Sequence, residues 1–290
     1  MIANNTDLLS LGIAIGKTGP VRPEAKINWV GQSSMDYADH FISGVNYKHA
    51  DCDGNGTIDK FDSIPILHNY SQKHNKTEQI NKATSTDPSL YFVMPSDKLV
   101  PGMTVNIPIM LGNNAIPVTN LYGMAYTINY NSLLIDSGSV NVKFDSTWMG
   151  TTGKNIISMQ KDFWYSGQVE LALTRTDNQN VSNYVQIGEL SFVLKEDISS
   201  NASSQMLKFS FSDATAISNN EHLIPVNLMS DSVAIFMNAS GIKYDFNKYR
   251  GSNINIYPNP AKEILYVEME NAQLQNINIF NSIGESVFNY

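Results

Sequence analysis

Apolar and polar residues alternate along most of the chain between residues 89 and 238. Apolar side chains recur at every second position in five segments: Met103/Val105/Ile107/Ile109/Leu111, Met124/Tyr126/Ile128/Tyr130, Val169/Leu171/Leu173, Leu190/Phe192/Leu194 and Leu207/Phe209/Phe211. A period of two puts alternate side chains on one face of a β-strand, and Asn, Ser, Gly and Asp turn residues separate the segments. The pattern predicts an antiparallel β-sandwich of the jelly-roll or immunoglobulin-like kind, with its core between two sheets.

The stretch from Asp59 to Tyr70 has a period close to that of a helix. Apolar residues fall at positions 61, 64, 67 and 70, and Asp59 precedes them as an N-capping acid. Pro65 interrupts this pattern, because proline lacks the backbone N–H that a helix interior needs. We therefore expect a helix here with a kink or a late start.

Two polar stretches without periodicity divide the chain into three parts. Residues 75–88 are rich in Lys, Asn, Thr and Ser and are predicted to be a linker, as are residues 239–252. The predicted domains are therefore residues 1–74, 89–238 and 253–290. The fold class expected for the whole chain is mainly β with a small α region.

Composition and charge exclude several classes of function. The chain has 290 residues and a formal net charge of −8, and only 16% of its residues are charged. It has no basic patch for nucleic acid and no polybasic run for a membrane surface. No apolar run approaches the length of a membrane span. One cysteine, Cys52, allows no disulfide framework and no zinc site of cysteine spacing.

Oxygen-bearing residues from position 51 to position 62 follow the ligand spacing of a calcium loop. They stand at loop positions 1, 3, 5, 7, 9 and 12: Asp51, Asp53, Asn55, Thr57 (through its carbonyl), Asp59 and Asp62. Calcium prefers such oxygen ligands, and Gly56 stands at position 6, where the loop turns sharply. A polar turn needs only two or three such residues at no fixed spacing. We predict that these six residues bind Ca²⁺.

The loop and the helix after it resemble the type I dockerin repeat. Asp62 stands where an EF-hand has Glu, and no clear helix precedes the loop. Dockerins carry two loop-helix repeats, and residues 1–15 align with the second half of another loop, which places Asn4 at position 9 and Asp7 at position 12. Met1 would occupy the glycine position, so we expect a truncated first loop that binds calcium weakly or not at all. Aromatic and apolar residues between the repeats are expected to pack on the two helices: Trp29, Met35, Tyr37, Phe41 and Val45.

Three segments of the predicted sandwich resemble cohesin-like domains. They run from Val100 to Ile109, from Leu121 to Asn131 and from Ile187 to Phe192, and they are similar to the "PG-x-x-V-x-I-P-V", "G-x-x-F-x-I-x-Y-D" and "G-x-L-x-F" strands of that family. Asn131 replaces the usual aspartate. The resemblance implies a jelly-roll sandwich that offers a sheet face to a protein partner.

The C-terminal segment resembles the sorting domain of the type IX secretion system of Bacteroidetes. The resemblance lies in a Y-P-N-P-A opening, followed about twenty residues later by I-x-I-F-N-x-x-G; the opening motif is Tyr257, Pro258, Asn259 and Pro260. It implies export through that machinery to the cell surface or the medium. The domain normally has further strands, so we expect truncation at this end too, and we expect that a signal peptide was lost with the N-terminus. By itself the segment predicts a small partial β-sandwich.

No catalytic constellation is evident in the sequence. The five histidines are scattered, and no phosphate-binding loop or nucleophile elbow occurs. Trp148, Trp164 and Tyr165 could stack on a sugar ring, although such residues more often fill a sandwich core.

Two hypotheses of function follow from the sequence. The first is a non-catalytic binding or assembly protein whose partner is a protein of the cohesin/dockerin type or a cell-surface polysaccharide. The alternative is the accessory C-terminal region of a secreted polysaccharide-degrading or proteolytic enzyme. If the dockerin-like and cohesin-like parts recognise each other, copies could also join head to tail.

Overall fold

The computed structural model describes residues 3–72, 83–198 and 204–236, together with four short strands near the C-terminus. By their internal contacts, residues Met1–Asn238 form one unit and Ala239–Tyr290 form another. Residues 73–82 and 239–252 lie outside the described residues, and these ranges include part of the first predicted linker and all of the second. None of the helices in the described ranges is long and apolar enough to cross a membrane.

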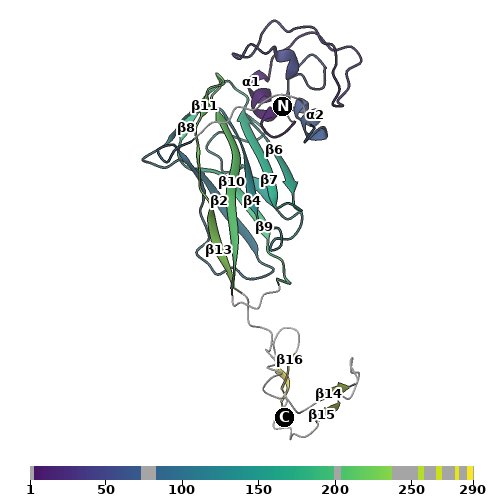
Figure 1. The fold of residues 1–290 in the computed structure, drawn as a ribbon, viewed down its shortest axis with the longest axis vertical. Helices are drawn as coiled ribbons and strands as arrows, with labels where there is room; N and C mark the ends of the chain where they lie inside the picture. The colour runs from purple at the N-terminus through teal and green to yellow at the C-terminus, as the bar shows by residue number, and fades with distance from the viewer. Residues whose placement is uncertain are drawn as a thin grey trace. The chain divides into compact units, whose positions relative to one another are not determined.

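Two β-sheets form the body of the first unit (Figure 1). The first sheet contains, in spatial order, β12 (Asn227–Leu228), β1 (Ser89–Phe92), β2 (Thr104–Leu111), β9 (Gln186–Val193) and β5 (Asn141–Lys143). The second contains β11 (Leu223–Ile224), β10 (Ser204–Ile217), β4 (Gly123–Tyr130), β7 (Gln168–Arg175) and β6 (Ile156–Phe163), and β13 (Asp231–Phe236) also pairs with β10. A short pair, β3 (Val118–Leu121) with β8 (Val181–Asn183), lies outside these sheets.

The core between the sheets contains the apolar positions that the alternation predicted. All five segments contribute, and only Met103 is half-buried at the edge of the cluster. Phe192 and Tyr126 are among the largest side chains with no exposed surface. One strand pair departs from the predicted antiparallel arrangement: β1 pairs with β12 in parallel.

The N-terminal part contains two short α-helices, α1 (Asp7–Ala14) and α2 (Ser63–His68). Two 3₁₀ turns, η1 (Tyr47–His49) and η2 (Lys60–Asp62), precede α2 in the chain. The predicted late helix start is present, since α2 begins only at Ser63. Pro65 therefore lies in its first turn, where no intrahelical partner for an N–H is needed.

The apolar positions that suggested the second helix do not form its buried face. Phe61, Ile64 and Leu67 are 53%, 52% and 38% exposed, whereas Pro65 and Ile66 are buried. The expected packing of the inserted aromatic and apolar residues is also only half correct. Tyr37 and Phe41 are buried, but Trp29, Met35 and Val45 are exposed.

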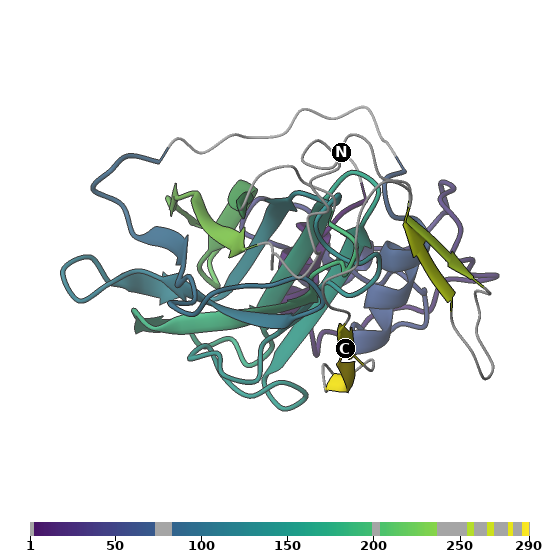
Figure 2. The same cartoon turned by 90° about the horizontal axis from the view of Figure 1, so that it is seen from below.

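Helix α1 lies against the outer face of the second sheet (Figures 1 and 2). It contacts β7, β4 and β6 and forms a second apolar cluster with them, separate from the core between the sheets. As a result, strand β4 is buried on both faces: Met124 and Tyr126 face the sandwich core, and Ala125 faces the helix. The module of residues 3–72 and the sandwich therefore share an apolar contact.

Trp164 and Tyr165 lie in the turn between β6 and β7 and are 54% and 70% exposed. The expectation that they fill the core is wrong, because the turn projects both side chains beyond the end of the two strands. Trp148 is half-buried and packs against the core.

The described residues of the C-terminal unit form two strand pairs. β14 (Ile254–Tyr257) pairs with β15 (Tyr266–Met269), and β16 (Asn278–Phe280) pairs with β17 (Ser286–Asn289), both antiparallel. Tyr257 of the sorting motif ends β14. Pro258, Asn259 and Pro260 lie outside the described residues.

Candidate metal centre and the docked helix

Three carboxylates of the predicted calcium loop lie close together. One oxygen from each of Asp51, Asp53 and Asp62 falls within 4.8 Å of the others. Oxygens that share one calcium ion at about 2.3–2.6 Å lie no more than about 5 Å apart, so this donor set fits the ion in chemistry and in spacing. Calcium would supply the positive charge that holds three neighbouring carboxylates together.

Backbone N–H groups orient two of these carboxylates. Asp51 accepts hydrogen bonds from Gly54 N (2.8 Å) and Gly56 N (3.1 Å), and from the Tyr37 hydroxyl (2.7 Å). Asp62 accepts from the backbone N–H groups at both ends of the loop: Cys52 (2.6 Å), Asp53 (3.1 Å) and Asp59 (2.8 Å). These bonds close the loop on itself and aim both carboxylates inward.

Burial makes Asp62 costly to ionise without a cation. Its side chain has no exposed surface. Burial raises its pKa to about 6, and the charges of Asp53 and Asp51 act in the same direction against the backbone hydrogen bonds, which lower it. A cation among the three carboxylates removes this penalty.

Residues just after α1 hydrogen-bond to the backbone of the loop. Gly19 N donates to Gly56 O and Arg22 N to Gly54 O, both at 2.9 Å. The Arg22 guanidinium donates to the carbonyls of Asp51 and Cys52 at 3.1 and 3.0 Å. Gly56 has a φ of 85°, and a Cβ there would lie 2.8 Å from Gly19 O. Only glycine fits this turn.

The other three predicted ligands, Asn55, Thr57 and Asp59, make different contacts from one another. Asn55 donates to Asp53 Oδ2 at 3.0 Å, and its own oxygen accepts from Thr57 N. Thr57 is exposed and forms a β-bridge with Thr18. Asp59 caps η2 by accepting from Phe61 N at 2.7 Å.

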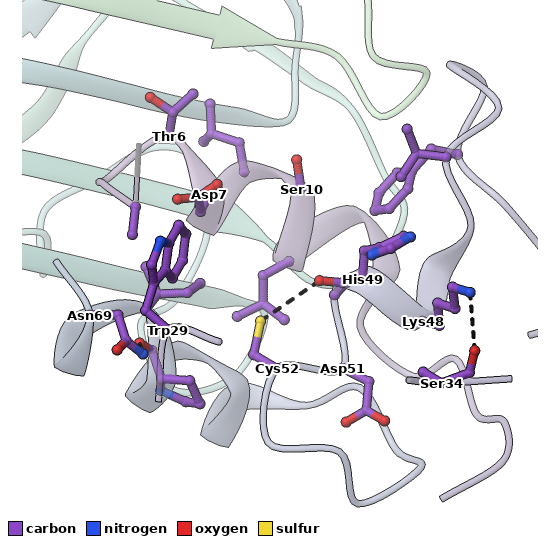
Figure 3. Close-up of a pocket in the computed structure, with 18 of the residues that line it drawn as sticks. Thr6, Asp7, Ser10, Trp29, Ser34, Lys48, His49, Asp51, Cys52 and Asn69 are labelled. Carbon is purple, nitrogen blue, oxygen red and sulfur yellow. Dashed lines mark hydrogen bonds between the residues drawn. The ribbon is translucent and has the colours of Figure 1, made fainter. Parts of the chain in front are cut away.

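The thiol of Cys52 takes no part in the carboxylate cluster. It lies 3.9 Å from the carbonyl of His49 (Figure 3). Burial, together with the Asp62 charge, raises the pKa of this thiol to about 12, so the thiol stays protonated near neutral pH.

The first repeat has the hydrogen-bond frame of the second. Asn4 N donates to Asp7 Oδ2 and Thr6 N donates to Asn4 Oδ1, both at 3.0 Å. Asp59, Phe61 and Asp62 form the same two bonds. Each pair of equivalent residues is 55 positions apart (59 minus 4, 62 minus 7).

The backbone pairing that follows each helix repeats in the same way. Ala3 exchanges hydrogen bonds with Ser71 and Gln72, as Ile58 does with Gly16 and Lys17. These partners are again 55 positions apart, and Gly16 and Ser71 both have a positive φ. The N-terminal module is thus built as two equivalent loop-helix halves.

Polar contacts fix the module on the sandwich. The Asn5 side chain donates to the carbonyls of Tyr126 (3.3 Å) and Leu171 (2.9 Å), and the Tyr122 hydroxyl donates to Gly12 O at 3.0 Å. At the two ends of the contact, Tyr70 donates to Glu170, and Glu221 accepts from the backbone of Ile42 and Ser43. Sequence reasoning did not identify these residues; the small residues on the outer face of β4 and β7 were the available signal.

A cleft of about 780 Å³ opens between α1, α2 and the segment after Arg22. Asp7 and Ser10 of α1 reach it from one side, and Trp29 and Asn69 lie across from them (Figure 3). It adjoins the metal centre through Cys52. Within the described residues it combines an exposed indole with charged and amide groups.

Comparison with known proteins identifies the C-terminal segment. Residues 255–290 match the family model described as a secretion system C-terminal sorting domain. The predicted sorting domain is confirmed. Such a domain indicates a secreted or cell-surface protein. Comparison with curated protein sequences gives no significant match.

Solved structures similar to this chain are cohesin domains. A cohesin in a type I cohesin-dockerin complex from Clostridium thermocellum is 15% identical, with a TM-score of 0.44 over 55% of this chain and 99% of its own. A cohesin module of a family 33 glycoside hydrolase from Clostridium perfringens is 13% identical (TM-score 0.40; 53% and 99% covered). A type II cohesin from Bacteroides cellulosolvens is also 13% identical (TM-score 0.41; 51% and 99% covered).

Proposed function

We propose that this chain is an exported, non-catalytic binding and assembly protein whose N-terminal module is stabilised by a calcium ion. Export is supported by the sorting domain at residues 255–290. The binding role is supported by the cohesin-like sequence motifs of the sandwich and by the module that packs on its sheet. Its partner is a protein of the cohesin/dockerin type.

The observation that carries the calcium proposal is the cluster of Asp51, Asp53 and Asp62 around one point. An ion that binds only the folded module stabilises it by mass action, by about 2.7 kcal/mol when free calcium is a hundredfold above the dissociation constant. Extracellular calcium sites of about 10⁻⁴ M affinity are common. A site of that strength would be occupied outside the cell and largely empty in the cytoplasm.

A cell-surface polysaccharide is a second candidate partner. Trp164 and Tyr165 project from the β6–β7 turn with ring centres 6.1 Å apart, and Phe163 contacts both Tyr165 and Tyr70. Exposed aromatic rings held from behind suit stacking on the apolar face of a sugar. Loss of binding to an immobilised glycan in Trp164→Ala, with calcium binding unchanged, would support this candidate.

The test of the calcium proposal is a calorimetric titration of calcium into chelator-stripped protein. We expect one site in the wild type, no site in Asp51→Ala or Asp62→Ala, and a melting temperature that rises with calcium only in the wild type. Asp145→Ala, which removes an exposed carboxylate of the sandwich, serves as the charge-matched control. A wild-type chain that binds no calcium would overturn the proposal.

A further inference from the structure

The outer face of the second sheet carries small residues on its two central strands where α1 packs, and we call this area the trough. Strands β4 and β7 form its floor, and β10 and β6 form its sides. In cross-strand register, Gly123 and Thr174 lie between Ile217 and Ile157, and Ala125 and Ala172 lie between Thr215 and Met159. A sheet with small central residues lets a helix approach the backbone closely.

Helix α1 fits this trough at one point of very close contact. A Cβ placed on Gly12 would lie 2.4 Å from the Thr174 side chain and 2.9 Å from the Arg175 carbonyl. On the other strand, a Cβ on Gly123 would lie 2.9 Å from Leu9. Real Cβ contacts are never this short, so α1 occupies its position only because residue 12 is glycine.

The equivalent helix of the module does not fit the trough. The 55-residue shift places Leu67 of α2 at the position of Gly12 and Lys60 at the position of Asn5. A leucine has no room at the closest contact, and an ammonium group cannot replace an amide that is 5% exposed and held by two carbonyls. Although α1 and α2 share the same hydrogen-bond frame, only α1 has side chains that fit the trough.

The contact between α1 and the trough is separable from the core of the sandwich. The residues between the two sheets form one cluster, and those between α1 and the sheet form another. Because removing the module leaves the first cluster complete, the trough is a surface that the chain covers with a part of itself. Its exposure would uncover apolar area.

We propose that this trough is a helix-recognition surface which each chain closes with its own α1, and that α1 of a second copy occupies it when the internal contact is broken. This inference rests on the proposed calcium-stabilised module, since α1 is presented by that module. In the intact chain the internal contact prevails, because tethering gives α1 an effective concentration that is millimolar for short flexible links. The same contact between copies is head-to-tail.

Two full-length variants test the proposal by complementation. Gly12→Leu prevents α1 from packing in the trough and leaves the trough residues unchanged. Ala172→Glu places a charge on the trough floor and leaves the helix intact. Each variant alone should be monomeric in calcium, with α1 amides that exchange faster than in the wild type. An equimolar mixture should sediment as a 1:1 dimer in which the α1 amides of the Ala172→Glu chain regain protection.

The control is Ser10→Leu, because Ser10 is the exposed position of α1. It should stay monomeric with protected α1 amides, alone and in mixtures. Asn5→Lys is a second helix variant, to be used if Gly12→Leu no longer binds calcium. Unchanged α1 protection in Gly12→Leu and Asn5→Lys, or a mixture that stays monomeric although both variants are open, would overturn the proposal.

Chelation separates this proposal from the calcium proposal. Dissociation of the mixed dimer by a chelator agrees with both. If the chains bind no calcium and the mixed dimer persists in chelator, the result supports recognition of α1 by the trough and contradicts the calcium proposal. If the chains bind calcium normally but the mixture forms no dimer, only the proposal that the trough recognises α1 is contradicted.

Discussion

The two loop-helix halves of the N-terminal module share a backbone frame but bury different things. In the first half, Asn5 and Gly12 lie against the sheet, and α1 is buried almost all round. In the second half the loop gathers three carboxylates, whereas Ile64 and Leu67 of its helix face solvent. The first half therefore makes the buried helix contact with the sandwich, and the second half contains the candidate metal site.

The two halves make different contacts although their local hydrogen-bond frame is the same. The capping bonds and the pairing that follows each helix are the same in both halves. Nine of the ten equivalent positions in residues 5–14 and 60–69 differ. Three of these differences fall on residues of the first half that meet the sheet: Asn5 against Lys60, Leu9 against Ile64, and Gly12 against Leu67. The shared hydrogen-bond frame fixes the position of each helix, and the side chains on the outer face of the helix determine what the helix packs against.

The largest expected effect comes from removing the buried amide of the first half. Asn5→Ala loses two hydrogen bonds to strand carbonyls and leaves a small cavity between α1 and the sheet. We expect the free energy of unfolding of the module to fall by about 3 kcal/mol. Denaturant unfolding in saturating calcium measures it.

The matched control for this change is Lys60→Ala, the equivalent position of the second half. Lys60 is exposed, so its removal should change stability by less than about 0.5 kcal/mol. Equal losses in the two variants would show that the halves do not differ in how they hold the sandwich.

The local parts of the structure were the parts that the sequence predicted best. The buried faces of the strands follow from a period of two, and the grouping of Asp51, Asp53 and Asp62 follows from the fixed spacing of one loop. Both depend on residues close together in the chain, where geometry leaves few choices.

The parts that the sequence did not predict depend on contacts between distant segments. Ala125 is buried only because α1, more than a hundred positions earlier, covers it. Phe61 and Ile64 have the spacing of a buried face, yet no other element of the described module covers them. Periodicity indicates that a face is apolar but not what lies on it.

The caps of the two halves give a smaller and sharper comparison. Asn4→Ala and Asp59→Ala each remove the side-chain oxygen that accepts from the residue two positions on. Without calcium, each should cost about 1 kcal/mol of stability. With calcium, Asp59→Ala should lose more, because residue 59 is also a predicted ligand. Parallel melts in chelator and in calcium measure the difference; an equal loss in both conditions would remove Asp59 from the ligand set.

The smallest expected effect lies on the exposed face of α2. Leu67→Ala makes this position resemble Gly12, and it removes a side chain that is 38% exposed and contributes little to the core. We expect a change within about 0.5 kcal/mol, with the good helix propensity of alanine offsetting the lost contacts. Gly12→Ala should instead destabilise the docked module despite the better helix former, by about 1–3 kcal/mol, because the added methyl group meets Thr174. Thermal melts of the two variants measure the difference between these two changes in stability. If Gly12→Ala stabilises the chain, α1 has room to move, and the close contact that distinguishes the two halves does not hold.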